Sequence, residues 1–289
     1  MQKDQLFTRR EALLAGAAVV GAAGTASLFA WRAGGGSPVR TGAPAAGAPA
    51  HHPPGRPSAY RLQPLTGYGP PRTAPARTPV RREPLLRITG RGRTMVLTFD
   101  DGPDPRYTPG ILDTLAEYDV HAMFFVCGEM AADHPHLLTR MADEGHTVGN
   151  HTWSHPLLTK LTRRQIRSEM TRTSEVVEDV YGERPRWFRA PYGAWNRAAF
   201  QLGSELGMEP LAWTVDTLDW TTPGASTIVD RVEDGAAPGV VVLSHDAGGD
   251  RSQSVRALRR YLPRLLDSGY HITVPQRQRT QALPPDPAF

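Results

Sequence analysis

The chain has 289 residues, 39% hydrophobic and 21% charged, which is enough for one or two folded domains and ordinary for a globular protein. Its single cysteine, Cys127, excludes an intrachain disulfide and lies in an apolar run that indicates a buried residue rather than a nucleophile. Residues 1–87 hold twelve of the 33 basic residues but only three of the 29 acidic ones, so the remainder has 21 basic and 26 acidic residues. This distribution argues against nucleic-acid binding by the folded part and favours a basic tether beside an anionic surface.

Residues 1–33 have the pattern of an export signal. Arg9 and Arg10 precede an uncharged stretch, rich in Ala and Gly, that runs from Ala12 to Trp31. The sequence around the two arginines resembles the twin-arginine signal that the bacterial Tat machinery reads, and the weak hydrophobicity of the stretch agrees with that. It is also just long enough for a plain membrane anchor, and no strong cleavage site follows. We therefore expect export across the cytoplasmic membrane, to an extracellular or wall-associated location, with the signal either removed or kept as an anchor.

Residues 34–85 are rich in Pro, Gly, Ala and Arg and show almost no periodic apolar pattern. Twelve of the 27 prolines lie between Pro38 and Pro84. Such a composition buries too little apolar surface to fold alone, so we predict a disordered, partly extended linker. The folded domain is expected at residues 86–276, followed by a flexible tail at 277–289.

From residue 86 onward, short apolar segments alternate with helical patterns. Strands are expected at Met95–Phe99, Ala122–Val126, Trp187–Arg189, Leu211–Val215, Val240–Leu243 and His271–Val274. Helices are expected at Thr108–Tyr118, Pro135–Glu144, Thr162–Tyr181, Asn196–Leu206, Thr227–Asp234 and Ser252–Leu266. Thr108 and Thr162 are the predicted N-caps of two of them. This alternation implies a parallel sheet with flanking helices, closed or open.

Asp100 and Asp101 end the first strand, immediately before the Gly102-Pro103 turn. Adjacent strand residues point to opposite sides, but the turn bends the chain so that both carboxylates can reach one pocket. Asp-Asp-Gly-Pro is also ordinary composition for a solvated turn, so this segment alone does not establish a site.

His151 and His155 are four residues apart, a spacing that places both rings on one face of a helical turn. With one carboxylate of the Asp-Asp segment they form a ligand set that binds a divalent metal and leaves a position open for water. The second carboxylate is then free to act as a general base. Together the two segments predict a metal-dependent hydrolase.

Three further segments follow strands, at Arg189–Gly193, Asp216–Trp220 and Leu243–Asp246. In order, the five segments resemble all five motifs of the polysaccharide deacetylase family, also called the NodB homology domain or carbohydrate esterase family 4. The resemblance covers roughly residues 90–275. It implies an α/β fold with a distorted (β/α)7-type barrel.

The resemblance also implies a metal centre and a base. Asp101, His151 and His155 would bind a divalent metal, usually zinc, although Co²⁺, Mn²⁺ or Ni²⁺ suit the same ligands. Asp100 would be the general base, and Arg189 would hold it by a charge-assisted hydrogen bond.

The remaining motif residues would complete the catalytic site. His245 would be the general acid that protonates the leaving amine, and Asp219 would orient it and keep it charged. The backbone N–H of Tyr192 would stabilise the oxyanion. Leu243 and Trp220 would wall the pocket that receives the acetyl methyl group.

The sequence therefore predicts an exported amidohydrolase, acting on carbon–nitrogen bonds other than peptide bonds, that removes N-acetyl groups from an amino-sugar polymer. Peptidoglycan is the leading substrate and chitin-type oligomers come next. Two alternatives stay open: an O-deacetylase of acetylated xylan, and a wall-binding pseudoenzyme without turnover. The intact metal and acid–base residues argue against the pseudoenzyme.

Overall fold

The computed structural model describes residues 78–88 and 92–275 of the chain. The predicted export signal (1–33), most of the predicted linker (34–85) and the predicted tail (277–289) lie outside these residues. Among the helices that are described, none combines the length and the apolar character that crossing a bilayer requires.

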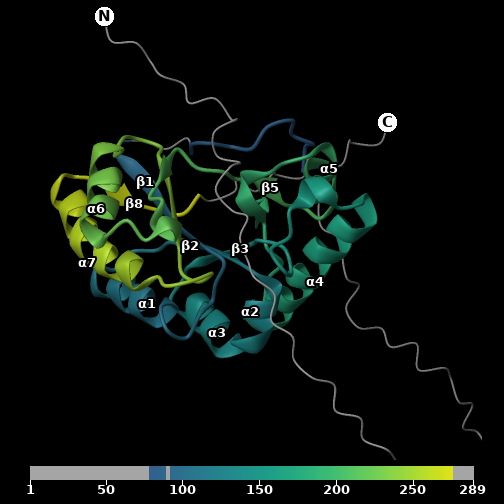
Figure 1. The fold of residues 1–289 in the computed structure, drawn as a ribbon, viewed down its shortest axis with the longest axis horizontal. Helices are drawn as coiled ribbons and strands as arrows, with labels where there is room; N and C mark the ends of the chain where they lie inside the picture. The colour runs from purple at the N-terminus through teal and green to yellow at the C-terminus, as the bar shows by residue number, and fades with distance from the viewer. Residues whose placement is uncertain (1–77, 89–91, 276–289) are drawn as a thin grey trace, which may run out of the picture. The chain divides into compact units, whose positions relative to one another are not determined.

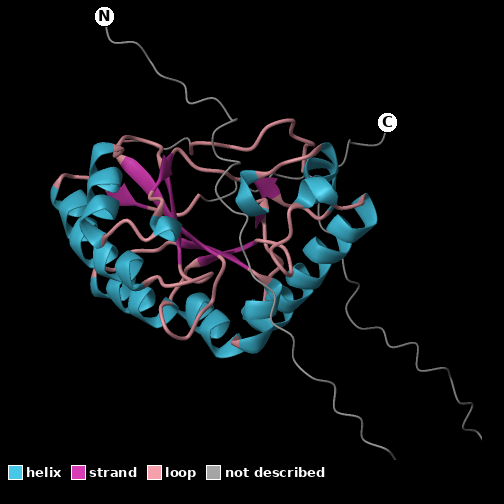
Figure 2. Cartoon of the chain, in the orientation of Figure 1, coloured by secondary structure: helices cyan, strands magenta, loops and turns pink. Residues whose placement is uncertain are grey.

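In the described ranges the strands form one eight-stranded sheet, and all of its named strand pairs are parallel. Its order is β5-β4-β3-β2-β1-β7-β6, and β8 pairs with the start of β1. Helices connect and cover the strands (Figure 2), as the alternating sequence pattern predicted. The strands are β1 (Thr94–Asp100), β2 (Met123–Val126), β3 (Thr147–Asn150), β4 (Trp187–Phe188), β5 (Glu209–Pro210), β6 (Val215–Asp216), β7 (Val241–His245) and β8 (His271–Ile272).

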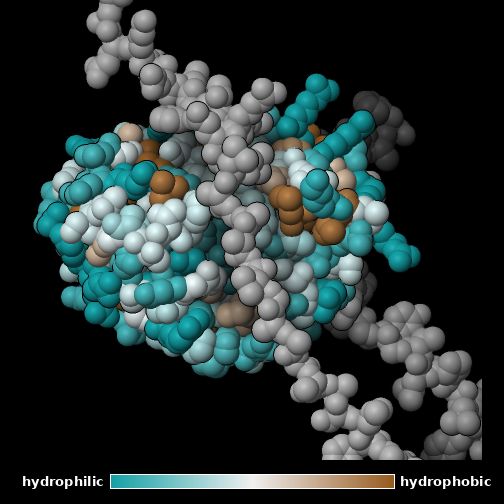
Figure 3. Space-filling model, in the orientation of Figure 1, coloured by the Kyte–Doolittle hydropathy of each residue, from teal (hydrophilic) through white to brown (hydrophobic). Residues whose placement is uncertain are grey.

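The helices of this domain lie along the outside of the sheet (Figure 1). Their outer surface is mostly hydrophilic (Figure 3), because their apolar residues face the core. The short helix α2 was not predicted, since six residues are too few to show a helical period. The helices are α1 (Thr108–Glu117), α2 (Gly128–Asp133), α3 (Pro135–Asp143), α4 (Arg163–Tyr181), α5 (Arg197–Glu205), α6 (Ala225–Asp234) and α7 (Ser252–Asp267), with 3₁₀ turns η2 (Leu158–Lys160), η3 (Pro191–Gly193) and η4 (Asp219–Thr221).

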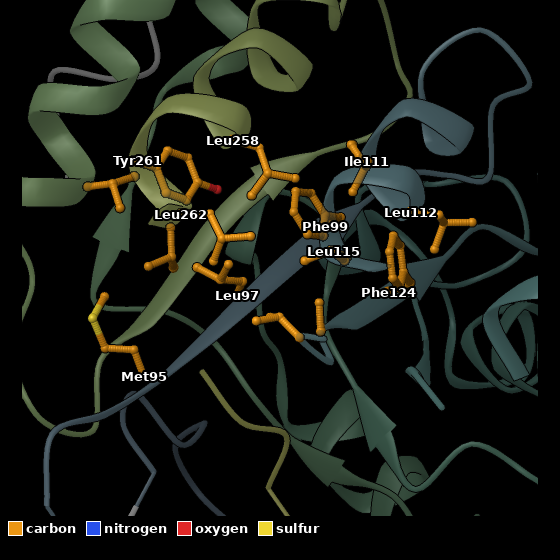
Figure 4. Close-up of a cluster of buried hydrophobic side chains, with 14 of the residues drawn as sticks. Met95, Leu97, Phe99, Ile111, Leu112, Leu115, Phe124, Leu258, Tyr261 and Leu262 are labelled. Atoms are coloured by element: carbon orange, nitrogen blue, oxygen red, sulfur yellow. The ribbon is translucent and has the colours of Figure 1, made fainter. Parts of the chain in front are cut away.

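Strand β1 runs through the middle of the sheet and is buried along almost its whole length. Met95, Leu97 and Phe99 point to one face, where they join the core with residues of α1 and α7 (Figure 4). Val96 belongs to the cluster on the other, inner face. Because side chains alternate along a strand, Asp100 lies on the same face as Val96, and its carboxylate is therefore presented on the inner side of the sheet.

The predicted strand at Leu211–Val215 is wrong as a single element. The chain forms β5 before it and β6 at its end, and these two strands lie at opposite edges of the sheet. Residues 211–214 make the crossing between the two edges. The apolar pattern does not show this break, since Leu211, Ala212 and Val215 are buried whether or not they belong to one strand.

Residues 78–85, the last part of the predicted linker, are hydrogen-bonded to the domain. Thr78 is buried and exchanges hydrogen bonds with Ser204, and Leu85 lies beside Leu211 in a parallel bridge. Ile88 then donates its N–H to Gly239. The folded part therefore begins before residue 86. Its first residues contact the domain through backbone groups, which a composition rich in proline does not reveal.

The N-termini of α4 and α1 differ in whether the predicted threonine caps them. Thr162 caps α4 as predicted, in a capping box with Gln165, and Gly182 ends that helix in a left-handed conformation (φ 89°). The prediction for Thr108 is wrong, because it is the first residue of α1 and its hydroxyl donates to the Asp246 carboxylate instead. A distant buried acceptor has taken the place of the local cap.

Replacing Thr162 with Ala is expected to lower the free energy of unfolding by about 1 kcal/mol, because the Gln165 N–H loses its side-chain acceptor. Urea unfolding followed by circular dichroism measures this. Thr159→Ala, at an exposed threonine of the preceding turn, is the matched control and should change the value by less than about 0.5 kcal/mol. Equal losses in the two variants would contradict the role of the capping box.

Candidate metal centre and acid–base site

The predicted site residues gather at one edge of the sheet. Parallel strands place their carboxyl ends together, so residues far apart in sequence meet there. Asp100 and His245 end β1 and β7 and are register partners across that strand pair. The others follow their strands directly or within a short turn: Asp101 after β1, His151 and His155 after β3, Arg189 and Tyr192 after β4, and Asp219 and Trp220 after β6.

Asp101, His151 and His155 form a cluster that suits a metal ion. One ligand atom from each lies within 4.8 Å of the others. The Nε2 atoms of His151 and His155 lie 3.5 and 3.3 Å from Asp101 Oδ1. That oxygen is buried and has no hydrogen-bond partner among the described residues, a costly state that a bound cation would relieve. The donor set of one carboxylate and two imidazoles fits a divalent metal such as zinc.

The electrostatics of the cluster favour the forms that bind metal. Burial raises the pKa of Asp101, but the neighbouring imidazoles, His151 above all, outweigh it and hold that pKa below its ordinary value. Burial and the neighbouring His151 lower the pKa of His155, which favours the neutral ring. His151 places Nδ1 2.9 Å from the Arg189 carbonyl oxygen; a proton on Nδ1 donates to it and leaves Nε2 free to coordinate.

The two histidines do not lie on a helical turn, so this part of the sequence interpretation is wrong. Residues 151–155 form a bent loop in which Thr152 and His155 have positive φ values, 71° and 55°. The Glu169 carboxylate on α4 accepts the N–H groups of Trp153 and Ser154, each at 2.9 Å. The tight loop, held by a helix, brings the rings together with centroids 4.9 Å apart.

Asp100 and Arg189 form a buried ion pair next to the metal cluster. Arg189 Nη1 donates to Asp100 Oδ1 at 2.6 Å, and both side chains are almost fully buried. Arg189 also donates to Thr98 Oγ1 and to the carbonyls of Leu211 and Ala212. Burial lowers the pKa of Arg189 while Asp100 opposes that shift, and an arginine keeps its charge in either case. The other oxygen of Asp100 is 3.6 Å from His151 Nε2, so it faces the metal cluster.

His245 and Asp219 form a second pair at the same sheet edge, where His245 is the register partner of Asp100. His245 Nδ1 lies 2.6 Å from Asp219 Oδ1. The backbone N–H of His245 donates to Asp219 Oδ2 at 2.9 Å. Burial alone would lower the pKa of His245, but the bond and charge of Asp219, with Asp101 and Asp100, raise it to about 9. The imidazole is therefore charged at neutral pH and can donate a proton.

Ser254 is a site residue that the sequence did not indicate. From the first turn of α7 its hydroxyl donates to Asp219 Oδ2 at 2.6 Å and is buried. Asp219 consequently accepts three hydrogen bonds, and its pKa is lowered even though burial raises it. Ser254 lies 35 residues from Asp219 with no motif around it, so only the packing of α7 reveals the contact.

The predicted substrate residues differ in exposure. Tyr192 is 68% exposed, has a φ of 60°, and places its ring edge against His155, with centroids 4.6 Å apart. Leu243 is buried within β7, whereas Trp220 is 56% exposed in η4. Leu243 can therefore form an inner wall, while Trp220 presents much of its ring to solvent.

Comparison with known proteins identifies related enzymes. The family model for polysaccharide deacetylases matches residues 87–211. The chain is 39% identical over 188 residues to a peptidoglycan-N-acetylglucosamine deacetylase of Bacillus cereus, covering 64% of this chain and 68% of that protein. It is 40% identical over 201 residues to a chitooligosaccharide deacetylase of Sinorhizobium fredii, covering 65% of this chain and 94% of that protein.

A solved structure confirms the fold. The crystal structure of a peptidoglycan N-acetylglucosamine deacetylase with 4-naphthalen-1-yl-N-hydroxybenzamide matches with a TM-score of 0.63 at 37% identity, covering 65% of this chain and 89% of that one. The predicted distorted (β/α)7-type barrel is thereby confirmed. The family-model match ends at residue 211, so for Asp219 and His245 the evidence comes from the geometry described above.

In the metal-free protein, His245 is expected to titrate near pH 9, and Asp219→Asn should lower its pKa by at least about one unit. The physical reason is that the variant removes the charge that outweighs burial. NMR titration of the imidazole measures both values. Asp230→Asn, at an exposed position of α6, is the control and should leave the titration unchanged.

Because folding raises the pKa of His245, the stability of the fold also depends on pH through the His245–Asp219 pair. The raised pKa means that the pair stabilises the fold fully below about pH 6.5, and that this stabilisation is lost as the pH rises through about 9. A His245 pKa that is the same in the parent protein and in Asp219→Asn would show that Asp219 does not set it.

Proposed function

Because the chain belongs to the polysaccharide deacetylase family and is an amidohydrolase of that class, we propose that it is an exported, metal-dependent enzyme that removes N-acetyl groups from an amino-sugar polymer. One observation carries this proposal: the metal cluster, a buried carboxylate–arginine pair and a charged imidazole–carboxylate pair gather at the same sheet edge. Amide hydrolysis needs a base for water, a sink for negative charge and an acid for the amine.

Asp101, His151 and His155 would hold the metal, with zinc as the proposed ion and Co²⁺, Mn²⁺ or Ni²⁺ as substitutes. When bound, the metal supplies Lewis acidity at the acetyl carbonyl. The three side chains keep that ion at the open edge of the sheet. The contact of His151 Nδ1 with the Arg189 carbonyl oxygen fixes the orientation of that ring.

Asp100 is the proposed general base. Its Oδ1 is held by Arg189, and its Oδ2 faces the metal cluster, where it accepts a proton from the attacking water. The developing negative oxygen is assigned to the backbone N–H of Tyr192.

His245 is the proposed general acid. As an imidazolium it donates its proton to the leaving nitrogen while the carbon–nitrogen bond breaks, which releases a free amine and acetate. Asp219 holds Nδ1, so the opposite nitrogen, Nε2, is the one that transfers the proton. Leu243 is the proposed wall for the acetyl methyl group, and the exposed ring of Trp220 is suited to stacking on a sugar.

Peptidoglycan is the proposed first substrate and a chitin-type oligomer the second. The relatives named above carry those two substrate classes in their names. The Tat-type pattern at Arg9 and Arg10 and the basic segment up to residue 87 support export and attachment near an anionic wall. Removing acetyl groups would add free amines to that wall and make it less anionic.

Acetate release by the full chain tests the activity. The substrates are peptidoglycan, chitooligosaccharide and acetylxylan, each with metal-stripped and zinc-restored protein. We expect zinc-dependent release from an amino-sugar substrate, because the buried Asp101 Oδ1 has no hydrogen-bond partner among the described residues and is placed to hold the ion with His151 and His155. Release from acetylxylan alone would reassign the protein to the O-deacetylases, and zinc binding without release would support the wall-binding alternative.

Asp100→Asn is expected to lower kcat by about 10²- to 10⁴-fold, because the amide cannot take up the proton of the attacking water. Zinc binding, measured by competition with a chromophoric chelator, should persist since Asp100 is not a proposed ligand. Asp119→Asn, an exposed residue whose positive φ of 52° asparagine tolerates, serves as the control. Full activity of Asp100→Asn would exclude Asp100 as the base.

A further inference from the structure

Asp246 makes contacts on both sides of the metal ligand Asp101. Its backbone N–H donates to the carbonyl of Asp100 at 3.1 Å. Its side-chain Oδ1 accepts the backbone N–H of Gly102 at 3.0 Å. The residue between these two contacts is Asp101. One residue of the loop after β7 therefore holds the chain immediately before and immediately after the carboxylate ligand.

The Asp246 carboxylate is itself buried and held by a hydrogen bond from Thr108. It is 1% exposed, and its Oδ2 accepts the Thr108 hydroxyl at 2.6 Å. Thr108 in turn accepts the N–H of Asp104 at 2.8 Å, so its hydroxyl hydrogen is available to Asp246. The carboxylate thus connects the turn after β1 to the start of α1. The approach is close enough that a side-chain carbon at Gly102 would overlap the carboxylate.

Asp101 needs such support because of its backbone conformation. Its φ is 78°, a left-handed value that a residue with a side chain adopts only where the surroundings impose it. The backbone N–H of Asp101 donates to the carbonyl oxygen of Phe125 at 3.2 Å, which holds the start of the turn against β2. The Gly102 N–H, accepted by Asp246, fixes the following peptide. Together these bonds determine the direction in which the Asp101 carboxylate points.

We propose that Asp246 is a positioning residue for the metal centre: by accepting the Gly102 N–H it holds Asp101 in the orientation in which its carboxylate meets His151 and His155. This inference rests on the metal centre of the proposed function. Asp246 contacts none of the three metal ligands' side chains through a hydrogen bond of the described structure, so it acts through the backbone of the turn.

The zinc affinity of the full chain tests this directly, measured at equilibrium with a chromophoric chelator and zinc alone. Burial raises the pKa of Asp246 to about 7 despite the hydrogen bond from Thr108, so the titrations are run at pH 8, where the carboxyl group is ionised. Asp246→Ala is expected to weaken zinc binding by about 10- to 100-fold, the usual effect of losing an outer-shell partner.

Asp246→Asn tests whether zinc affinity depends on the hydrogen bond that Asp246 accepts from Gly102 or on the negative charge of Asp246. It removes the negative charge but keeps one oxygen that can accept the Gly102 N–H, so positioning predicts an affinity within about threefold of the parent protein, well above that of the Ala variant. An affinity as low as that of Asp246→Ala would mean that charge alone matters and would overturn the proposal. Asp250→Asn, an exposed charge on the same loop, should leave zinc affinity unchanged.

A second variant covers the case in which Asp246→Ala does not fold. Should circular dichroism show that Asp246→Ala is unfolded, Thr108→Val decides instead: it removes the donor that orients the Asp246 carboxylate, and it should weaken zinc binding several-fold. Unchanged affinity in the folded Ala variant, or in Thr108→Val, overturns the positioning role while the metal centre stands. A parent protein that binds no zinc overturns the metal centre and this inference together.

Discussion

The buried pair between Arg189 and Asp100 is the interaction on which most of this site depends. A fully buried guanidinium is costly, and it is compensated here by a carboxylate, a hydroxyl and two backbone carbonyls. The backbone carbonyl of Arg189 also accepts from His151, so one residue supports both the proposed base and a proposed metal ligand. Ala212, whose carbonyl holds Arg189, donates its own N–H to Leu85. The segment before the first strand is therefore connected to Asp100 through one backbone hydrogen bond and the side chain of Arg189.

Two ion pairs lie at the same sheet edge as the metal cluster. Asp100 is paired with the Arg189 guanidinium, and His245 is paired with the Asp219 carboxylate, which raises the pKa of the imidazole to about 9 despite its burial. Asp100 and His245 are register partners on neighbouring strands. The edge therefore brings together the carboxylate proposed as the base and the imidazole proposed as the acid for amide cleavage.

Strained backbone is concentrated at this edge. Asp101, Thr152, His155, Tyr192 and Leu218 all have positive φ values without being glycine. Two of these segments are held by bonds from elsewhere: Glu169 holds the histidine loop, and Asp246 holds the turn beside Asp101. Such conformations persist only where the surrounding structure imposes them, so the rigid helices and strands of the barrel also fix the geometry of the site.

The amino-acid sequence by itself determined the alternation of strands and helices, the apolar β1, the cap at Thr162 and the residue types of the metal and acid–base groups. These depend on local periodicity and on side-chain chemistry, which are readable along the chain. Only the tertiary structure decided that residues 151–155 form a loop, that β5 and β6 lie at opposite edges, and that Ser254 and Asp246 support the site. Those features arise from contacts between segments 15 or more residues apart or from the order of strands, and no local pattern records which distant group a hydroxyl or carboxylate meets.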